Sequence, residues 1–193
     1  MINCGKSRRR TRGSGDLKRL IFINGTMGVG KTTVARALQK KLPSCAFLDG
    51  DWCWDASPFV VTDETKEMVL GNIAAVLDGL LRCSAYENII LAWVMHEKTI
   101  IDDILGRLSA QGCDFFLFTL IACPEVIKQR LCADIESGLR SKGIITRSQE
   151  RAEHYQDMNS VVIDTGDLTP EQAAGAIISA LDEDMNGACA SDS

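Results

Sequence analysis

One stretch near the start of the chain, LIFINGTMGVGKTTVARAL at residues 20–38, constrains the fold more than any other. A short apolar run leads into a glycine-rich loop, which ends in Lys31-Thr32 at the start of an amphipathic segment. The loop has the spacing GxxxxGK[ST], a motif that is significant only where it follows a strand and precedes a helix. The chain must therefore contain a strand, a tight loop and a helix in this order.

The chemistry of this loop predicts a phosphate ligand. Glycines let the backbone curl so that successive N–H groups point at phosphate oxygens, and the following helix adds the positive end of its dipole. Lys31 supplies a positive charge for the outer phosphates, and the Thr32 hydroxyl can bind Mg²⁺. We therefore expect the loop to bind a nucleoside triphosphate together with its magnesium ion. The expected cofactors are ATP and Mg²⁺. The loop residues expected to hold the nucleotide are Gly25, Thr26, Met27, Gly28, Val29, Gly30, Lys31, Thr32 and Thr33.

Apolar runs alternate with helical patterns along the middle of the chain. NIILAWVM at residues 88–95 is an almost unbroken apolar run, typical of a strand that is covered on both faces. Strands that alternate with helices predict a three-layer α/β/α fold with a parallel sheet, whose ligand-binding loops lie at the carboxyl ends of the strands. The predicted strands are 20–24, 45–49, 88–95, 114–122 and 160–165, and the predicted helices are 31–42, 64–82, 100–108, 124–137 and 169–183.

Length and composition set limits on the class of protein. The 193 residues indicate one domain, and the net charge of −5 gives no reason to expect nucleic acid as a partner. No apolar stretch is long enough to cross a bilayer, so no membrane association is expected. The eight cysteines show no metal-binding spacing, which favours reduced thiols in a cytoplasmic protein. We expect a disordered basic arm at 1–18, a folded domain at 19–183 and a flexible tail at 184–193.

Two carboxylates follow the second predicted strand, at the sheet edge where the phosphate loop lies. Asp49 can hold the hydration shell of Mg²⁺, and Asp51 can accept a proton from an attacking hydroxyl. The alternative is a surface turn that merely ends the strand. We predict that Thr32 and Asp49 bind the metal and that Lys31 and Asp51 are catalytic.

The third predicted strand lacks a feature of many nucleotide hydrolases. It runs to Val94 and Met95 with no acidic residue at its end, where a magnesium-binding aspartate is usual. The sequence also contains no NKxD-like motif for reading guanine. Both absences disfavour a GTPase switch and a mechanical ATPase. They also make Asp49 the expected carboxylate for magnesium binding.

These motifs resemble the small P-loop kinases, which include shikimate and gluconate kinases, chloramphenicol phosphotransferase and nucleoside monophosphate kinases. Within them the chain is similar to the tunicamycin-resistance protein group. The shared patterns are the ING…G.GKT start, a GRL…G…F.L.A..E…RL run at 106–131 and an I.T..L…..A pattern within 160–173. The resemblance covers roughly residues 19–180 and implies a five-stranded sheet in the order 2-3-1-4-5. It also implies a mobile lid at about residues 130–151 and an acceptor site roofed by the helices after strand two.

The resemblance assigns roles to residues of the lid. Arg130 matches the family residue that starts the lid near the adenine, and Arg130, Arg140 and Arg147 are predicted to stabilise the transferred phosphoryl group. Asp134 stands where the family usually has a second arginine, so the lid function must pass to Arg140 or Arg147 or be lost. The segment IDTGDLT resembles the loop around the adenine, which makes Asp167 a further nucleotide-binding candidate.

The acceptor site is defined by fewer signals. Trp52 and Trp54 follow the aspartate pair and can stack on a sugar or a base, and His96 can hydrogen-bond an acceptor. With Asp51, these are the predicted substrate residues. Structural roles are the alternatives: Trp93 lies inside the predicted third strand and is expected in the core, and His96 fits a helix-entry position.

We therefore expect a kinase that transfers the γ-phosphate of ATP to a hydroxyl of a small molecule. A nucleoside monophosphate kinase is an alternative, but it needs arginines for the second phosphate, and residues 50–81 contain none. A non-catalytic ATP-binding protein that sequesters a drug is the other alternative. The expected partner is the small-molecule acceptor, and the expected assembly is a monomer or a homodimer.

Overall fold

The computed structural model describes residues 18–110, 112–138, 143–146, 148, 155 and 158–189, with side chains up to residue 183. Its strands are β1 (Lys18–Asn24), β2 (Cys45–Asp49), β3 (Asn88–Ala92), β4 (Cys113–Ile121) and β5 (Val161–Asp164). Its helices are α1 (Lys31–Lys41), the 3-10 helix η1 (Gly50–Trp54), α2 (Asp63–Arg82), α3 (Lys98–Arg107), α4 (Pro124–Glu136) and α6 (Pro170–Cys189).

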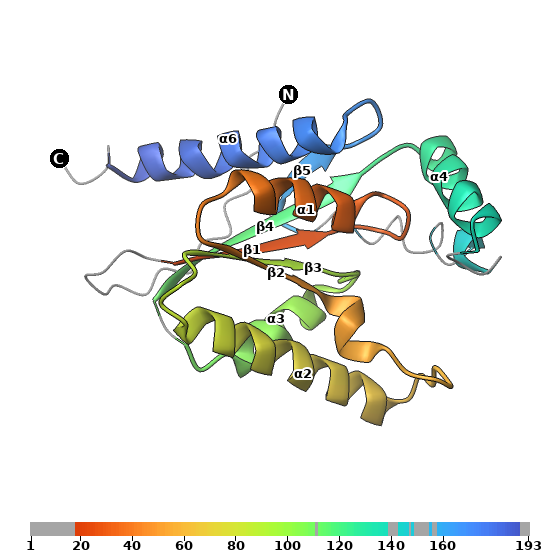
Figure 1. Cartoon of the computed structure of the whole chain (residues 1–193), viewed down its shortest axis with the longest axis horizontal. Coiled ribbons are helices and arrows are strands. Elements are labelled where there is room, and N and C mark those ends of the chain that lie inside the picture. Colours follow the sequence, from red (N-terminus) through yellow and green to blue (C-terminus); the bar gives the residue numbers. More distant parts are fainter. Residues whose placement is uncertain are drawn as a thin grey trace.

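The five strands form one parallel sheet in the order β2-β3-β1-β4-β5, so the predicted fold and strand order are confirmed. Figure 1 shows the sheet between two helical layers, with α1 and α6 on one face and α2 and α3 on the other. Central strand β1 is an apolar run because both of its faces are covered. Ile21 and Ile23 pack on the α1 and α6 side. Leu20 and Phe22 pack on the α2 and α3 side.

Strand β3 ends at Ala92, before its predicted end at Met95. The fully buried Asn24 side chain donates from Nδ2 to Met95 O at 2.8 Å and accepts from Met95 N through Oδ1 at 2.9 Å. These two bonds satisfy both main-chain polar groups of Met95, so the chain leaves the sheet without losing hydrogen bonds. Trp93, expected in the strand, instead lies just beyond its end and is partly exposed.

Two elements extend beyond the expected domain limits. Strand β1 begins at Lys18, a residue that the sequence assigned to the basic arm, because Lys18 pairs with Cys113 of β4. Helix α6 continues past residue 183 to Cys189, and no proline interrupts the sequence between 171 and 189. Residues 1–17 of the arm lie outside the described part of the chain. In the part that is described, no helix is long and apolar enough to cross a membrane.

The partly buried cysteines serve as small apolar side chains. Burial raises the pKa of the thiols of Cys45, Cys53 and Cys113, that of Cys45 to about 11. Thiols with raised pKa values stay protonated at neutral pH and are poor nucleophiles and poor metal ligands. These three thiols are therefore poor candidates for catalytic or metal-binding residues.

Candidate active site

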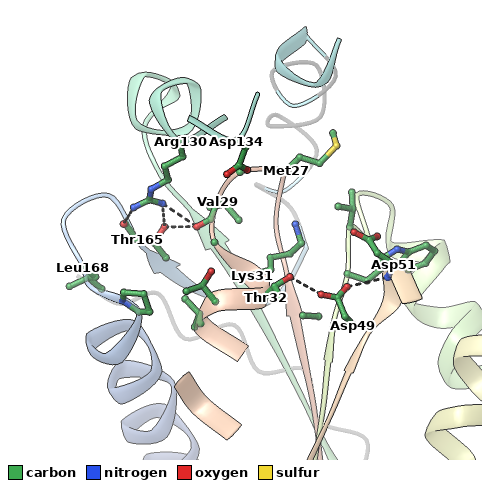
Figure 2. Close-up of a pocket in the computed structure, with 18 residues that line it drawn as sticks. Met27, Val29, Lys31, Thr32, Asp49, Asp51, Arg130, Asp134, Thr165 and Leu168 are labelled. Carbon is green, nitrogen blue, oxygen red and sulfur yellow. Dashed lines mark hydrogen bonds between the residues drawn. The ribbon is translucent and has the colours of Figure 1, made fainter. Parts of the chain in front are cut away.

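A pocket of about 380 Å³ lies at the carboxyl edge of the sheet. Figure 2 shows it bordered by the phosphate loop, the turn after β2, the part of α4 that carries Arg130 and Asp134, and the segment that leads into α6. This is the edge at which parallel sheets place their ligand-binding loops. Of the predicted site residues, the lining includes Met27, Gly28, Val29, Gly30, Lys31, Thr32, Thr33, Asp49, Asp51 and Arg130.

The phosphate loop has the backbone shape of an anion cradle. Gly25 has a φ of +136°, and a Cβ atom there would lie 2.5 Å from Leu120 O of β4. Gly30, with a φ of 103°, occupies the N-cap of α1 and has no side chain to cap the first helical turn. Lys31 Nζ donates to Thr26 O at 2.9 Å, so the lysine lies along the loop. The uncapped N–H groups at the start of α1 fit an anionic ligand.

Side chains from distant parts of the sequence bind the carbonyl groups of this loop. Val29 O accepts from Thr165 Oγ1 at 3.0 Å and from Arg130 Nη1 at 3.2 Å. Arg130 Nη2 also donates to Thr165 O at 2.8 Å, and Ser148 Oγ donates to Met27 O at 2.8 Å. A fixed carbonyl group fixes its whole peptide plane, including the N–H group on the other side. These contacts therefore preorganise the N–H groups of the loop for a ligand.

A hydroxyl and a carboxylate meet in the pocket as a pair suited to Mg²⁺. Thr32 Oγ1 donates to Asp49 Oδ2 at 2.7 Å, and Asp49 is only 7% exposed. The other oxygen, Asp49 Oδ1, accepts from Asp51 N at 3.1 Å and so caps η1. The described residues contain no group of three or more His, Cys, Asp or Glu side chains that could hold a metal. Mg²⁺ bound here would need phosphate oxygens and water to complete its coordination, as is usual for Mg²⁺ in nucleotide sites.

Asp51 lines the same pocket in a different environment. It is exposed, in the first turn of η1, and its carboxylate accepts no hydrogen bond from any residue that the structure describes. A carboxylate without protein donors can accept a hydrogen bond from the hydroxyl of a ligand. Asp49 is therefore hydrogen-bonded by its neighbours, whereas the Asp51 carboxylate is available to a ligand.

The predicted arginines are only partly described. Arg130 lines the pocket, and its guanidinium donates to Val29 and Thr165, as Figure 2 shows. Arg140 and Arg147 lie outside the described residues. Asp134, where the kinase families usually have an arginine, also lines the pocket. The contacts of Arg130 indicate that it positions the phosphate loop.

Three of the predicted nucleotide-binding residues lie outside the pocket lining. Gly25 and Thr26 are buried beneath the loop, and Thr26 Oγ1 donates to Ser148 O at 2.9 Å. Both residues therefore contribute to the conformation of the loop and not to the pocket lining. Asp167 is exposed and is absent from the lining, whereas its neighbour Leu168 is part of it.

The predicted tryptophans pack against side chains outside the pocket lining. The Trp52 ring packs edge-to-face on Phe47 with centroids 5.6 Å apart, and the Arg36 guanidinium lies 5.2 Å from its centre. Trp54 packs against Phe59, with centroids 4.8 Å apart. Neither tryptophan belongs to the described lining.

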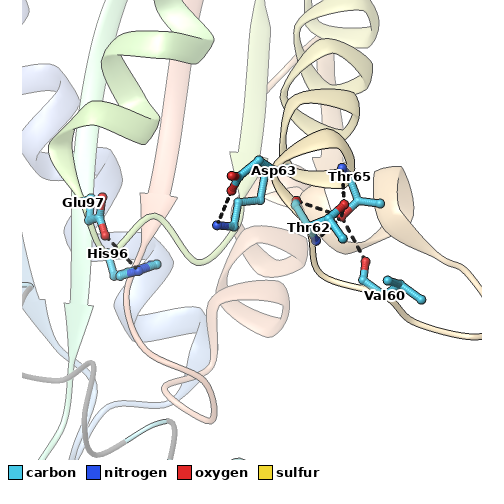
Figure 3. A network of polar contacts seen from close by, with 7 residues as sticks. Val60, Thr62, Asp63, Thr65, His96 and Glu97 are labelled. Carbon is cyan, nitrogen blue, oxygen red and sulfur yellow. Dashed lines mark hydrogen bonds and ion pairs between the residues drawn. The ribbon is translucent and has the colours of Figure 1, made fainter.

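His96 also lies outside the lining, at the entrance to α3. Its Nε2 is 3.5 Å from Glu97 Oε1, and Glu97 is the N-cap of α3, which matches the helix-entry alternative. Figure 3 shows this pair together with the start of α2, where Thr62 and Thr65 form a capping box. Thr62 N donates to Thr65 Oγ1 at 2.8 Å, and Thr65 N donates to Thr62 Oγ1 at 3.2 Å.

The lining residues that sequence reasoning left out of the site include Trp93, Val94 and Thr165. All three directly follow strands β3 and β5, at the carboxyl edge of the sheet. Their position in the fold would have identified them, because this edge is where ligands bind in parallel sheets. Trp93 and Val94 were missed because the strand was expected to continue to Met95.

Comparison with known proteins identifies the family to which the chain belongs. Residues 21–156 match the AAA domain family. A relative from Pyrococcus furiosus, provisionally named an adenylate kinase, is 26% identical over 174 residues, which cover 84% of this chain and 83% of the relative. The match to the family includes the phosphate loop, both aspartates and all of residues 130–151, where the lid is expected.

Two solved structures share the fold. The tunicamycin resistance protein of Deinococcus radiodurans has a TM-score of 0.65 at 22% identity, over 85% of this chain and 95% of that protein. A sugar kinase from Janibacter sp. HTCC2649 has a TM-score of 0.66 at 20% identity, over 86% of this chain and 95% of the kinase. The chain therefore belongs to the AAA domain family and has the fold of the P-loop kinase superfamily.

Proposed function

We propose that the protein is an ATP-dependent phosphotransferase that moves the γ-phosphate to a hydroxyl group of a small molecule. The observation that supports this most strongly is the contrast between two aspartates beside the phosphate loop. Asp49 is bound by Thr32 Oγ1 and Asp51 N, whereas the carboxylate of Asp51 is exposed in the same pocket. One carboxylate is thus suited to the metal, and the other is suited to an acceptor.

The nucleotide would be held by the phosphate loop and the start of α1. Lys31 and the N–H groups of the first helical turn would neutralise the outer phosphates. Thr32 and Asp49 would hold Mg²⁺ through oxygen atoms. Bound magnesium ATP supplies the phosphoryl group and a stabilised leaving group. Leu168 and Pro170 give the lining an apolar part that suits the purine ring.

Asp51 would control the proton of the acceptor. The acceptor hydroxyl donates a hydrogen bond to the carboxylate, and Asp51 takes the proton as the hydroxyl oxygen bonds to phosphorus. The bond from that phosphorus to the β-phosphate oxygen breaks, and its electron pair leaves with ADP. Lys31 and the N–H groups of the loop stabilise the charge on the transferred group.

The relative from Pyrococcus furiosus favours a second candidate, transfer to a nucleoside monophosphate. Such an acceptor carries its own phosphate, which proteins usually bind with arginine or lysine. Among the described lining residues the cations are Lys31 and Arg130, and Arg130 already donates to Val29 and Thr165. The neutral hydroxyl acceptor therefore remains our proposal.

Asp51→Asn tests the proposed function. The substitution keeps the size of the side chain but removes the proton acceptor, so Mg-ATP affinity measured by calorimetry should stay within about twofold. Acceptor-dependent ADP release, measured with a panel of sugars, nucleosides, nucleoside monophosphates and antibiotics, should fall by about 10²–10⁴-fold. Asp55→Asn is the matched control, because Asp55 is exposed and lies outside the described lining.

Three results would contradict the proposal in different ways. Normal turnover by Asp51→Asn would remove Asp51 from the chemistry. ATP binding without a phosphorylated product from any member of the panel would support the non-catalytic ATP-binding alternative. A lack of calorimetric heat with magnesium and any purine triphosphate would exclude the phosphate loop as a nucleotide site.

A further inference from the structure

Trp93 is fixed at the acceptor end of the pocket by the way in which β3 ends. Its main-chain N donates to Ile23 O at 3.2 Å, and Asn24 binds both main-chain polar groups of Met95. The chain on either side of Trp93 is therefore anchored to the end of β1. The Trp93 side chain packs partly against the α2 and α3 core and stays partly exposed, and Trp93 is one of the residues that line the pocket.

Gly50, which separates the two aspartates, sets the position of the indole ring. A Cβ atom on Gly50 would lie 2.7 Å from Cβ of Trp93, 2.5 Å from Cδ1 and closer still to Cγ. The ring therefore lies directly against the main chain between Asp49 and Asp51. Any residue other than glycine at position 50 would displace the ring.

The lining around Trp93 is apolar and acidic. Ala92 and Val94 flank the tryptophan, and Asp51 supplies a carboxylate. Figure 2 shows Arg130 and Thr165 on the side of the phosphate loop opposite to Asp51. Within the described lining, the cation on the Asp51 side is thus Lys31, which the proposed function assigns to the nucleotide. Among the described lining residues, no arginine on this side offsets the repulsion between Asp51 and an anionic acceptor.

Trp93 offers two features to a ligand. Its ring supplies an apolar face of the kind that binds the C–H groups of a sugar ring, and no described residue accepts a hydrogen bond from its indole N–H. Asp51 likewise accepts no hydrogen bond from a described side chain. A flat apolar face beside an available donor and an available acceptor matches a neutral ring that carries hydroxyl groups.

We propose that Trp93 determines acceptor specificity, and that the acceptor is a neutral sugar ring stacked on its indole with one hydroxyl directed at Asp51. This inference rests on the proposed function and names the substrate class of the same site. The ring can belong to a free carbohydrate or to the ribose of a nucleoside, which share this chemistry. Sugar acids and sugar phosphates are disfavoured by the Asp51 carboxylate.

A binding experiment tests the inference without turnover. The chain has three tryptophans, so a variant with Trp52→Phe and Trp54→Phe leaves Trp93 as the sole indole reporter. Its emission is followed with magnesium and an ATP analogue with a nitrogen β–γ bridge, during titration with neutral monosaccharides, neutral nucleosides, and the phosphorylated and carboxylated forms of both. We expect a saturable change with a neutral compound and none with its anionic forms. Saturation by an anionic form, or by no compound, would overturn the inference.

Steady-state kinetics of variants at Trp93 and Gly50 provide the second readout. With the neutral acceptor identified by fluorescence, Trp93→Ala should raise the acceptor KM about tenfold and leave the ATP KM unchanged, and Trp93→Phe should recover most of the loss. Gly50→Ala should act like Trp93→Ala because it displaces the ring. Gly79→Ala is its matched control, since a Cβ atom there meets nothing within 4 Å. An unchanged acceptor KM in Trp93→Ala would also overturn the inference.

The outcomes separate the inference from the proposed function. Phosphorylation of an anionic acceptor would overturn the sugar-ring assignment and leave the phosphotransferase intact. Saturable binding of a neutral sugar ring without any phosphorylated product would support the Trp93 site and contradict the proposed activity.

Discussion

A side-chain hydrogen bond joins Thr32, at the start of α1, to Asp49, at the end of β2. Their hydrogen bond of 2.7 Å joins residues 17 positions apart, and it places a buried carboxylate next to the hydroxyl that a magnesium ion would bind. Because Asp49 is almost fully buried, its charge is costly unless it is paired or hydrogen-bonded. A bound cation would therefore gain more from this carboxylate than from an exposed one.

Asp49→Asn should weaken the binding of the magnesium ion on which nucleotide binding depends. The amide keeps an oxygen for Thr32 but removes the negative charge, so the magnesium concentration that gives half-maximal ATP binding should rise about tenfold or more. Magnesium titrations of ATP binding, followed by calorimetry, measure this. Unchanged magnesium dependence, with Asp55→Asn as the exposed control, would assign the metal to other ligands.

Thr165→Val should weaken ATP binding by loosening the phosphate loop. The substitution removes a hydroxyl that donates to Val29 O, is also within reach of Ile121 O, and accepts from Arg130 Nη1, and it keeps the shape of the buried side chain. One lost hydrogen bond corresponds to about 1 kcal/mol, or about a fivefold weaker Kd. Thr165→Ser retains the hydroxyl and should bind as the parent protein does. Equal affinity of the valine and serine variants would show that this bond does not position the loop.

At the scale of elements, two side-chain links join α2 to the carboxyl end of α3 and to the segment that follows it. Arg107 binds Glu67 through two parallel bonds, Nη1 to Oε1 at 2.6 Å and Nη2 to Oε2 at 2.7 Å. Asp78 Oδ1 accepts from the main-chain N of Ser109 and of Ala110, both at 3.0 Å. These links hold the carboxyl end of α3 against α2, and both helices pack on the core that also contacts Trp93.

The stabilisation from Glu67 should depend on pH. The hydrogen bonds and the charge of Arg107 lower the pKa of Glu67 below its ordinary value of 4.5. A carboxyl with a lowered pKa in the folded state stabilises above the unfolded pKa, and the stabilisation disappears as the pH falls through the folded pKa. Glu67→Gln should therefore lower the urea midpoint at pH 7 and have little effect at pH 2, whereas exposed Glu64→Gln should have little effect at either pH. An equal loss at both pH values for Glu67→Gln would contradict the ionic origin.

Local patterns predicted the elements well, and contacts between distant residues explain what they missed. The phosphate loop and the order of strands follow from residues close together in sequence and from the family resemblance. The end of β3 does not, because it depends on the Asn24 amide, 71 positions away from Met95. Trp52 and Trp93 differ from their expected places for the same reason: Trp52 packs on Phe47 and Arg36 and stays exposed, and Gly50 makes room for the Trp93 ring.

At the scale of the whole molecule, ligand binding and folding should be coupled. The pocket is formed by residues that lie between Met27 and Pro170, so a bound nucleotide connects most of the described domain. Magnesium ATP at about 100 times its Kd stabilises the folded state by about 2.7 kcal/mol, which corresponds to a rise in Tm of about 5–10 °C for a domain of this size.

Lys31→Ala should abolish most of this rise in Tm. The substitution removes the charge for the outer phosphates and leaves the core unchanged, so the Tm without ligand should change little. Differential scanning fluorimetry with magnesium ATP, and with magnesium alone as the control, measures both values. A full ligand-induced rise in the alanine variant would show that the triphosphate binds elsewhere.

The bonds to Val29 have a consequence for synthesis of the chain. The phosphate loop leaves the ribosome early, but its donor Thr165 lies 136 positions later, and Ser148 lies 121 positions after Met27. A nascent chain that stops before β5 contains the whole glycine-rich motif without these supports. Long-range closure of this kind comes late in folding. Nucleotide capture should therefore begin only after Thr165 has been synthesised and has packed against the loop.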